Sequence, residues 1–171
     1  MYAHDAVTIQ MKQRSPRRRF VAMDIENING GAVGSVGLAD AAWREVADAI
    51  ELDDGEQVVI GVGPSSLLAT GLSVPSARVV MGRGISGADH ALIEVLRDEH
   101  IANRFDEVVI VSGDGIFAEV AAWLAFEGAD VTIVARSGHL SIRLHLAAGD
   151  VVLLPEQDPD LKQDLDLGTV A

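Results

Sequence analysis

Carboxylates that follow apolar segments are the residues of this sequence best placed for chemistry. Asp24 closes the apolar segment 20–24, and Asp114 comes three residues after the apolar segment 108–111. Asp89 follows a glycine-rich stretch. If the apolar segments are parallel strands of one sheet, the three carboxylates lie at the edge where strands end, which is where such sheets bind ligands. We therefore expect the three aspartates to face one crevice.

Carboxylates gathered in one crevice repel one another, and a hard cation such as Mg²⁺ or Mn²⁺ relieves this repulsion by taking oxygen ligands. Such an ion polarises a phosphate and lowers the pKa of a bound water. The pattern therefore favours phosphodiester hydrolysis. Each aspartate also has a plainer interpretation: Asp24 as an acceptor in a turn, Asp89 as a favourable charge in a first helical turn, and Asp114 as an N-cap.

The elements that must position these residues follow from hydrophobic periodicity. Apolar runs predict strands at residues 20–24, 58–62, 78–81, 108–111, 131–135 and 151–154. Helical spacing predicts helices at residues 38–50, 64–71, 88–100, 117–127 and 140–146. Strands that are apolar on every residue need cover on both faces, and strands that alternate with helices pair in parallel. The predicted fold class is α/β, a three-layer sandwich with a mostly parallel central sheet.

Length and composition indicate one globular domain. The 171 residues suit a single core. The absence of cysteine excludes disulfides, thiolate metal sites and cysteine nucleophiles. No apolar run is long enough to span a bilayer, and no signal peptide is expected, so a cytoplasmic location and no membrane partner are predicted. We expect a flexible basic arm at 1–18, the domain at 19–155 and a flexible acidic tail at 156–171.

The net charge of −13 argues against a protein that holds nucleic acid by bulk electrostatics. Any contact with an anionic partner must then be local. Charge placement suggests Arg83, Arg136, Arg143 and the basic arm for that contact, and the arm could also steer a partner. The plainer interpretation of the arm is a solvated segment.

Three segments, in order, carry a resemblance to a known family. Val21–Asn27 (VAMDIEN) resembles the opening motif of NYN domains, a branch of the PIN-like nucleases, and Gly87–Ile93 (GADHALI) is similar to their middle acidic motif. Val109–Phe117 (VIVSGDGIF) is similar to their third motif, Ser-Gly-Asp-x-Asp-Phe. The resemblance extends over residues 20–155.

The resemblance implies a PIN-like sheet, a divalent metal and cleavage of RNA. It implies that Asp24, Asp89 and Asp114 are catalytic and hold Mg²⁺ or Mn²⁺. Asn27 and Ser112 would support these ligands or the phosphate, and Glu26 would add a nearby carboxylate. RNA is the expected partner, as substrate, with a homo-oligomer or protein partner as a further expectation.

One position departs from the family pattern. Ile116 stands where the third motif normally has a second aspartate, which weakens metal affinity unless Glu119 or Glu26 compensates. This leaves the alternative of a catalytically degenerate NYN domain that binds RNA or protein. A third hypothesis is a small-molecule phosphatase in which Asp24 is the nucleophile and Glu26 replaces the second aspartate of a paired motif.

Overall fold

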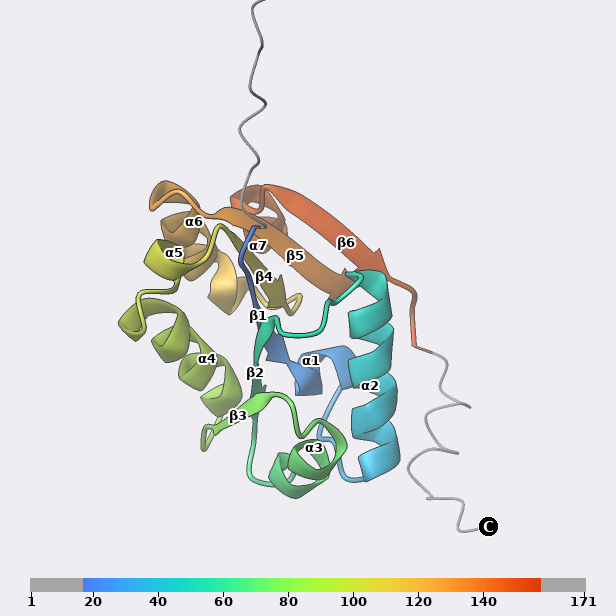
Figure 1. Cartoon of the computed structure of the whole chain (residues 1–171). Coiled ribbons are helices and arrows are strands. Elements are labelled where there is room, and N and C mark those ends of the chain that lie inside the picture. The colour runs from blue at the N-terminus through green and yellow to red at the C-terminus, as the bar shows by residue number, and fades with distance from the viewer. Residues whose placement is uncertain (1–16, 158–171) are drawn as a thin grey trace, which may run out of the picture.

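A six-stranded parallel sheet forms the centre of the molecule, in a computed structural model that describes residues 17–157. The strand order is β3-β2-β1-β4-β5-β6 (Figure 1), and every neighbouring pair is parallel. The strands are β1 (Arg19–Asp24), β2 (Gln57–Val62), β3 (Arg78–Met81), β4 (Glu107–Val111), β5 (Asp130–Arg136) and β6 (Asp150–Leu154). All six predicted strands are confirmed. The chain reverses its direction of travel across the sheet between β1 and β4, so the ligand crevice of such a fold lies there.

Helices cover both faces of the sheet, and the predicted three-layer α/β sandwich is confirmed. The helical segments are α1 (Ile25–Asn29), α2 (Val36–Ala49), α3 (Leu67–Ser73), α4 (Gly87–Asp98), α5 (Ile101–Arg104), the 3₁₀ turn η1 (Gly115–Phe117), α6 (Ala118–Phe126) and α7 (Ile142–Ala147). The five predicted helices are present with shifted ends. The sequence did not predict α1 and α5, because five and four residues are too few to show a helical period.

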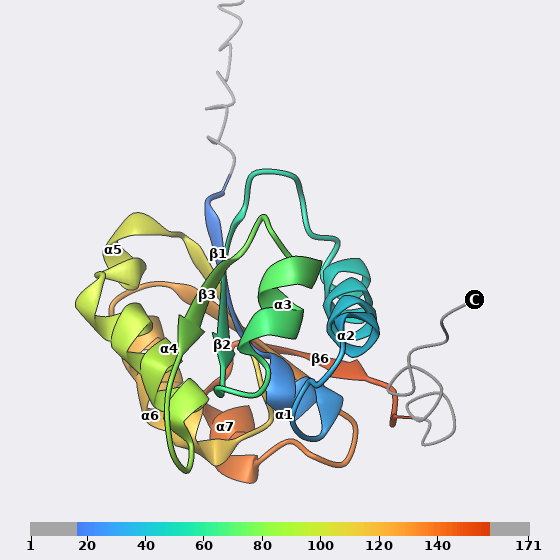
Figure 2. The same cartoon turned by 90° about the horizontal axis from the view of Figure 1, so that it is seen from below.

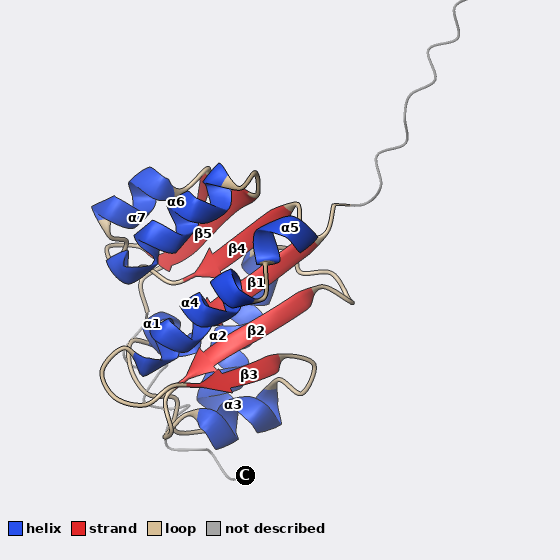
Figure 3. Cartoon of the chain, turned by 90° about the vertical axis from the view of Figure 1, so that its left-hand side faces the viewer, coloured by secondary structure: helices blue, strands red, loops and turns tan. Residues whose placement is uncertain are grey.

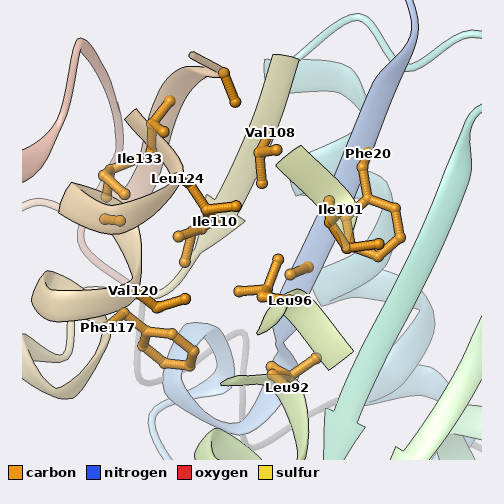
Figure 4. Packing of buried hydrophobic residues seen from close by; sticks show 14 of the residues in the cluster. Phe20, Leu92, Leu96, Ile101, Val108, Ile110, Phe117, Val120, Leu124 and Ile133 are labelled. Carbon is orange, nitrogen blue, oxygen red and sulfur yellow. The ribbon is translucent and has the colours of Figure 1, made fainter. Parts of the chain in front are cut away.

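Side chains of the central strands alternate between two hydrophobic clusters, which explains why these strands are apolar throughout. Phe20 on β1 belongs to a cluster that also includes residues of α4, α5, η1, α6 and α7, and Figure 4 shows it beside Ile101. Val21 and Met23 point to the opposite face, into a cluster formed with α1 and α2. Burial on both faces fixes β1 and β4 firmly, and with them the residues at their carboxyl ends.

Glycines bring the start of α4 against the sheet. A Cβ atom added at Gly61 on β2 would lie 2.6 Å from Leu92 Cγ and 2.9 Å from the carbonyl oxygen of Ala88. One added at Gly82 would collide with the backbone of Gly87. These glycines therefore serve close packing, and the packing fixes where the first turn of α4 lies relative to the strand ends.

Within residues 17–157, no helix is long and apolar enough to cross a membrane. The expected basic arm and acidic tail fall outside these residues, except for residues 17–18 and 156–157.

Candidate functional site

Asp24 and Asp89 meet at the carboxyl edge of the sheet. Asp24 is the last residue of β1 and Asp89 lies in the first turn of α4. Their side chains are hydrogen-bonded to each other, and the residues are only 5% and 7% exposed. Since a carboxylate cannot donate a hydrogen bond, the protonated carboxyl group of Asp24 is the donor and Asp89 is the acceptor. Two of the three predicted ligands are thus brought together.

Burial is the main reason why the pKa of Asp24 rises from its ordinary value of 3.8 to about 8. The hydrogen bond that protonated Asp24 donates to Asp89 and the negative charges of Asp89 and Glu26 raise it further, while the backbone N–H of Asn27 lowers it. No arginine or histidine within residues 17–157 forms an ion pair with either aspartate. The pair therefore lacks a compensating positive charge from this part of the chain.

Asn27 joins the ends of β1 and β4. Asp24 caps α1, because its Oδ1 accepts the N–H of Asn27 at 3.1 Å. The side-chain Oδ1 of Asn27 in turn accepts the N–H of Gly113 at 2.9 Å. The link spans the point where the strand order reverses, so Asn27 holds the two sides of the crevice in register. The plainer interpretation of Asp24 as a capping residue is also correct.

Asp114 lies at the same edge but does not complete a group of three carboxylates. It is exposed, its Oδ1 caps η1 by accepting the N–H of Ile116 at 3.0 Å, and its own N–H donates to Ser112 Oγ at 3.2 Å. Ser112 is fully buried. Within residues 17–157, no three histidine, aspartate or glutamate side chains form a group that could hold a metal ion. The structure therefore shows Asp114 as an N-cap beside the buried pair.

Glu26 and Glu119 are the two residues expected to replace the carboxylate missing at Ile116, and their side chains have different partners in the structure. Glu26 Oε1 accepts hydrogen bonds from the N–H of Gly63, at 2.9 Å, and from the hydroxyl of Ser66. The carboxylate of Glu26 therefore fixes the loop after β2. Glu119 is exposed and pairs with Arg97 at 2.8 Å.

Arg97 lies in the last turn of α4, whereas Asp89 lies in the first turn. Eight residues of helix separate the two, a rise of about 12 Å. The expectation that Glu119 could compensate is therefore wrong. Ile116 itself is partly buried and packs against the hydrophobic cluster under η1, so this position contributes packing.

Most of the arginines expected to contact an anionic partner are already engaged. Arg136 is 5% exposed. It donates to the carbonyl oxygens of Ile28 and Pro155, each at 3.0 Å, and pairs with Glu45. The expectation that Arg136 contacts RNA is wrong, because its donors hold α1, α2 and the end of β6 together.

Arg17 and Arg18, the described arginines of the expected arm, lie together with Arg19 at the opposite edge of the sheet, where β1 begins (Figure 3). Arg17 pairs with Asp130, Arg18 with Asp106 and Arg19 with Glu56. They cannot reach the carboxyl edge, where the candidate site lies, because the length of the sheet separates the two edges.

A pocket of 160 Å³ opens beside Asn27. Ile28, Gly30, Ser137 and His139 contribute to its lining. The backbone of His139 also lies so close to Gly113 that a Cβ there would collide with it. The sequence did not single out this pocket, because its walls come from α1 and from the loop after β5, which are more than a hundred residues apart.

The donor set at the buried pair fits a hard divalent cation. Mg²⁺ is commonly bound through one or two carboxylates, with waters and substrate phosphates completing its shell. Asp24 and Asp89 supply two such carboxylates at the carboxyl edge of the sheet, and no arginine or histidine of residues 17–157 forms an ion pair with them. A cation there would favour the ionised form of Asp24 and would lower its pKa from about 8.

No family model and no curated protein matches this chain. Its fold is similar to the crystal structure of a protein of unknown function from Vibrio parahaemolyticus, with a TM-score of 0.57 over 84% of this chain and 94% of that chain. Identity between the two is 16%, so the likeness concerns the fold alone.

Proposed function

We propose that the chain is a divalent-metal-dependent ribonuclease that hydrolyses RNA phosphodiester bonds at the Asp24–Asp89 pair. The observation that carries the proposal is this buried pair of hydrogen-bonded carboxyl groups at the point where the strand order reverses. Two buried acids without a positive partner destabilise a fold, and a carboxyl group with a pKa raised as strongly as that of Asp24 is typical of functional sites. The three NYN-like motifs supply the substrate class.

The chain's residues take distinct roles in this proposal. Asp24 and Asp89 hold Mg²⁺ or Mn²⁺, which when bound supplies an activated water and polarises the phosphate. Asn27 keeps the ends of β1 and β4 in register through Gly113. Asp114, exposed at the N-cap of η1, offers a further carboxylate on the substrate side, and Ser112 orients its backbone.

A second candidate is a catalytically degenerate domain that binds RNA or protein without cleaving it. Ile116 and the capping role of Asp114 favour it, because residues 17–157 hold no group of three metal-ligating side chains. The phosphatase hypothesis lacks such support. It needs Asp24 as a free nucleophile, and Asp24 is 5% exposed and bonded to Asp89. It also needs a free second acid, and Glu26 is bonded to Gly63 and Ser66.

The test is cleavage of a labelled single-stranded RNA by the full chain with Mn²⁺, with Mg²⁺ or with EDTA. We expect metal-dependent cleavage that falls at least about 100-fold in Asp24→Asn and in Asp89→Asn, since each removes a carboxylate ligand. Asp98→Asn is the matched control, because Asp98 is exposed at the other end of the same helix. It should cleave like the natural chain.

Cleavage that persists in EDTA or in Asp24→Asn would refute the nuclease proposal. If the folded natural chain does not cleave while Ile116→Asp does, the degenerate domain is the correct candidate. Circular dichroism of each variant establishes that it is folded.

A further inference from the structure

Two arginines differ from all others in the described part of the chain. Residues 17–157 contain ten arginines and no lysine. Eight of them form ion pairs with aspartate or glutamate, namely Arg17, Arg18, Arg19, Arg44, Arg78, Arg97, Arg104 and Arg136. Within this part of the chain, Arg83 and Arg143 have no carboxylate partner, and both are exposed. Their charge is available to a partner molecule.

Both arginines lie at the carboxyl edge of the sheet, on opposite sides of the candidate site. Arg83 is in the loop between β3 and α4, directly after Gly82, which packs against the start of α4. Arg143 is in the first turn of α7. The entry to α7 is tied to the end of β4, because the N–H of Ser141 donates to the carbonyl oxygen of Gly113 at 2.9 Å. Figure 2 shows α7, α1 and the loop before α4 on the same side of the molecule.

The sheet gives the scale of this arrangement. Arg83 follows β3 and Arg143 follows β5, and β2, β1 and β4 lie between them. Four interstrand spacings of about 4.8 Å separate the two strand ends by about 20 Å. A stacked strand of nucleic acid rises about 3.4 Å per nucleotide, so about six nucleotides cover this span. Asp24 ends β1, which is the middle strand of the five from β3 to β5.

We infer that Arg83 and Arg143 bind backbone phosphates of single-stranded RNA on either side of the Asp24–Asp89 pair. The inference rests on the proposed function and adds how the substrate is held. A guanidinium group matches a phosphate in a bidentate arrangement, and in a chain of net charge −13 two uncompensated arginines are the local attraction that an RNA strand needs. Each arginine has an exposed aliphatic neighbour, Ile85 (99% exposed) and Ile142 (78% exposed), against which a base can pack.

The experiment measures affinity by fluorescence anisotropy of a labelled 12-nucleotide RNA, with the full chain in EDTA so that no metal-dependent cleavage occurs. Arg83→Gln and Arg143→Gln should each weaken binding roughly tenfold at low salt. Each should reduce the slope of log affinity against log salt by about 0.7, the value for one phosphate contact on a single strand. Arg44→Gln is the matched control. Arg44 is an exposed arginine on α2 that pairs with Asp40, so its loss should leave affinity and slope unchanged.

Chain length distinguishes two-point binding from diffuse attraction. A trinucleotide is too short to reach both arginines, so the natural chain should bind the 12-mer much more tightly than the trimer. Most of that gain should be lost in either single variant. RNA binding with an unchanged slope in both variants would overturn the inference and leave the nuclease proposal standing, since cleavage depends on Asp24 and Asp89. Tighter binding of a poly-glutamate peptide than of RNA would also overturn it, and would indicate an acidic protein partner.

Discussion

Replacing Asp24 with asparagine should stabilise the protein at alkaline pH. The natural side chain is buried beside Asp89, and burial, hydrogen bonding and charge raise its pKa from 3.8 to about 8. In the unfolded chain the same carboxyl group ionises near 3.8. The folded state therefore binds this proton more tightly, and the contribution of Asp24 to stability is largest below pH 3.8 and falls as the pH rises toward 8. Asparagine removes this titration and can still cap α1, because its Oδ1 can accept the N–H of Asn27.

The magnitude follows from the pKa shift. Between pH 5 and pH 8 the natural chain loses up to about 4 kcal/mol of stability through Asp24, at about 1.4 kcal/mol per pH unit. Relaxation around the pair and entry of water reduce this value, so we expect the advantage of Asp24→Asn to grow by about 2 kcal/mol across that range. For a domain of this size, 1 kcal/mol corresponds to a Tm change of about 3 °C. The variant should therefore gain about 6 °C on the natural chain between pH 5 and pH 8.

The assay is thermal unfolding in EDTA at pH 5, 6.5, 8 and 9, followed by circular dichroism. Asp114→Asn is the matched control, since Asp114 caps η1 through the same kind of bond but is exposed. The Tm of Asp114→Asn should change with pH in the same way as the Tm of the natural chain. If the Tm values of the natural chain and of Asp24→Asn change with pH in the same way, Asp24 does not hold a proton in the folded state, and the description of Asp24 as a protonated donor to Asp89 is wrong.

Two further substitutions test how the fold holds the site. Asn27→Ala leaves the N–H of Gly113 without its partner at 2.9 Å, which should cost about 1 to 3 kcal/mol in the free energy of unfolding from urea titrations. Equal stability of Asn27→Ala and the natural chain would mean that the hydrogen bond between Asn27 and Gly113 does not stabilise the fold. Gly61→Ala places a methyl group 2.6 Å from Leu92 Cγ and 2.9 Å from the carbonyl oxygen of Ala88. This substitution should lower the free energy of unfolding by about 1 to 3 kcal/mol, because it pushes α4 away from the sheet. Gly71→Ala is the control and should not lower it, because the added atom there has open space around it. Equal Tm values for the two variants would contradict the packing argument.

The architecture was predictable from the sequence because its strongest signals are periodic. Segments such as 108–111 are apolar on every residue, and this pattern requires cover on both faces of the sheet. The parallel arrangement then places Asp24, Asp89 and Asp114 at one edge. The helix α1 escaped prediction because one turn of helix has no measurable period, and the glycines after it suggested a loop.

The details of the site were not predictable because they depend on contacts between distant residues. The burial of Arg136 requires Glu45, which lies 91 positions earlier on α2. The proximity of Asp24 and Asp89 depends on Gly61 and Gly82, which let α4 approach the strand ends. The spacing of residues in the sequence predicts the edge of the sheet at which a side chain lies. It does not predict which of several possible hydrogen-bond partners that side chain takes. This is why the sequence left both an N-cap and a metal ligand open for Asp114 and favoured the ligand, whereas the structure shows the N-cap.

Protons and a divalent cation should compete for the Asp24–Asp89 pair. Both aspartates are held by rigid elements, Asp24 by β1 and Asp89 by the glycine-packed start of α4. The pair therefore cannot relieve its repulsion by moving apart, and must bind either a proton or a cation. Because the pKa of Asp24 is about 8 without a cation, the affinity for Mn²⁺ should rise up to about tenfold per pH unit below pH 8 and level off above it. Electron paramagnetic resonance of free Mn²⁺ at pH 6.5, 7.5 and 8.5 measures this affinity, with Asp24→Asn as the variant that should lose the pH dependence. An affinity of the natural chain that does not change with pH would show that Mn²⁺ binds elsewhere.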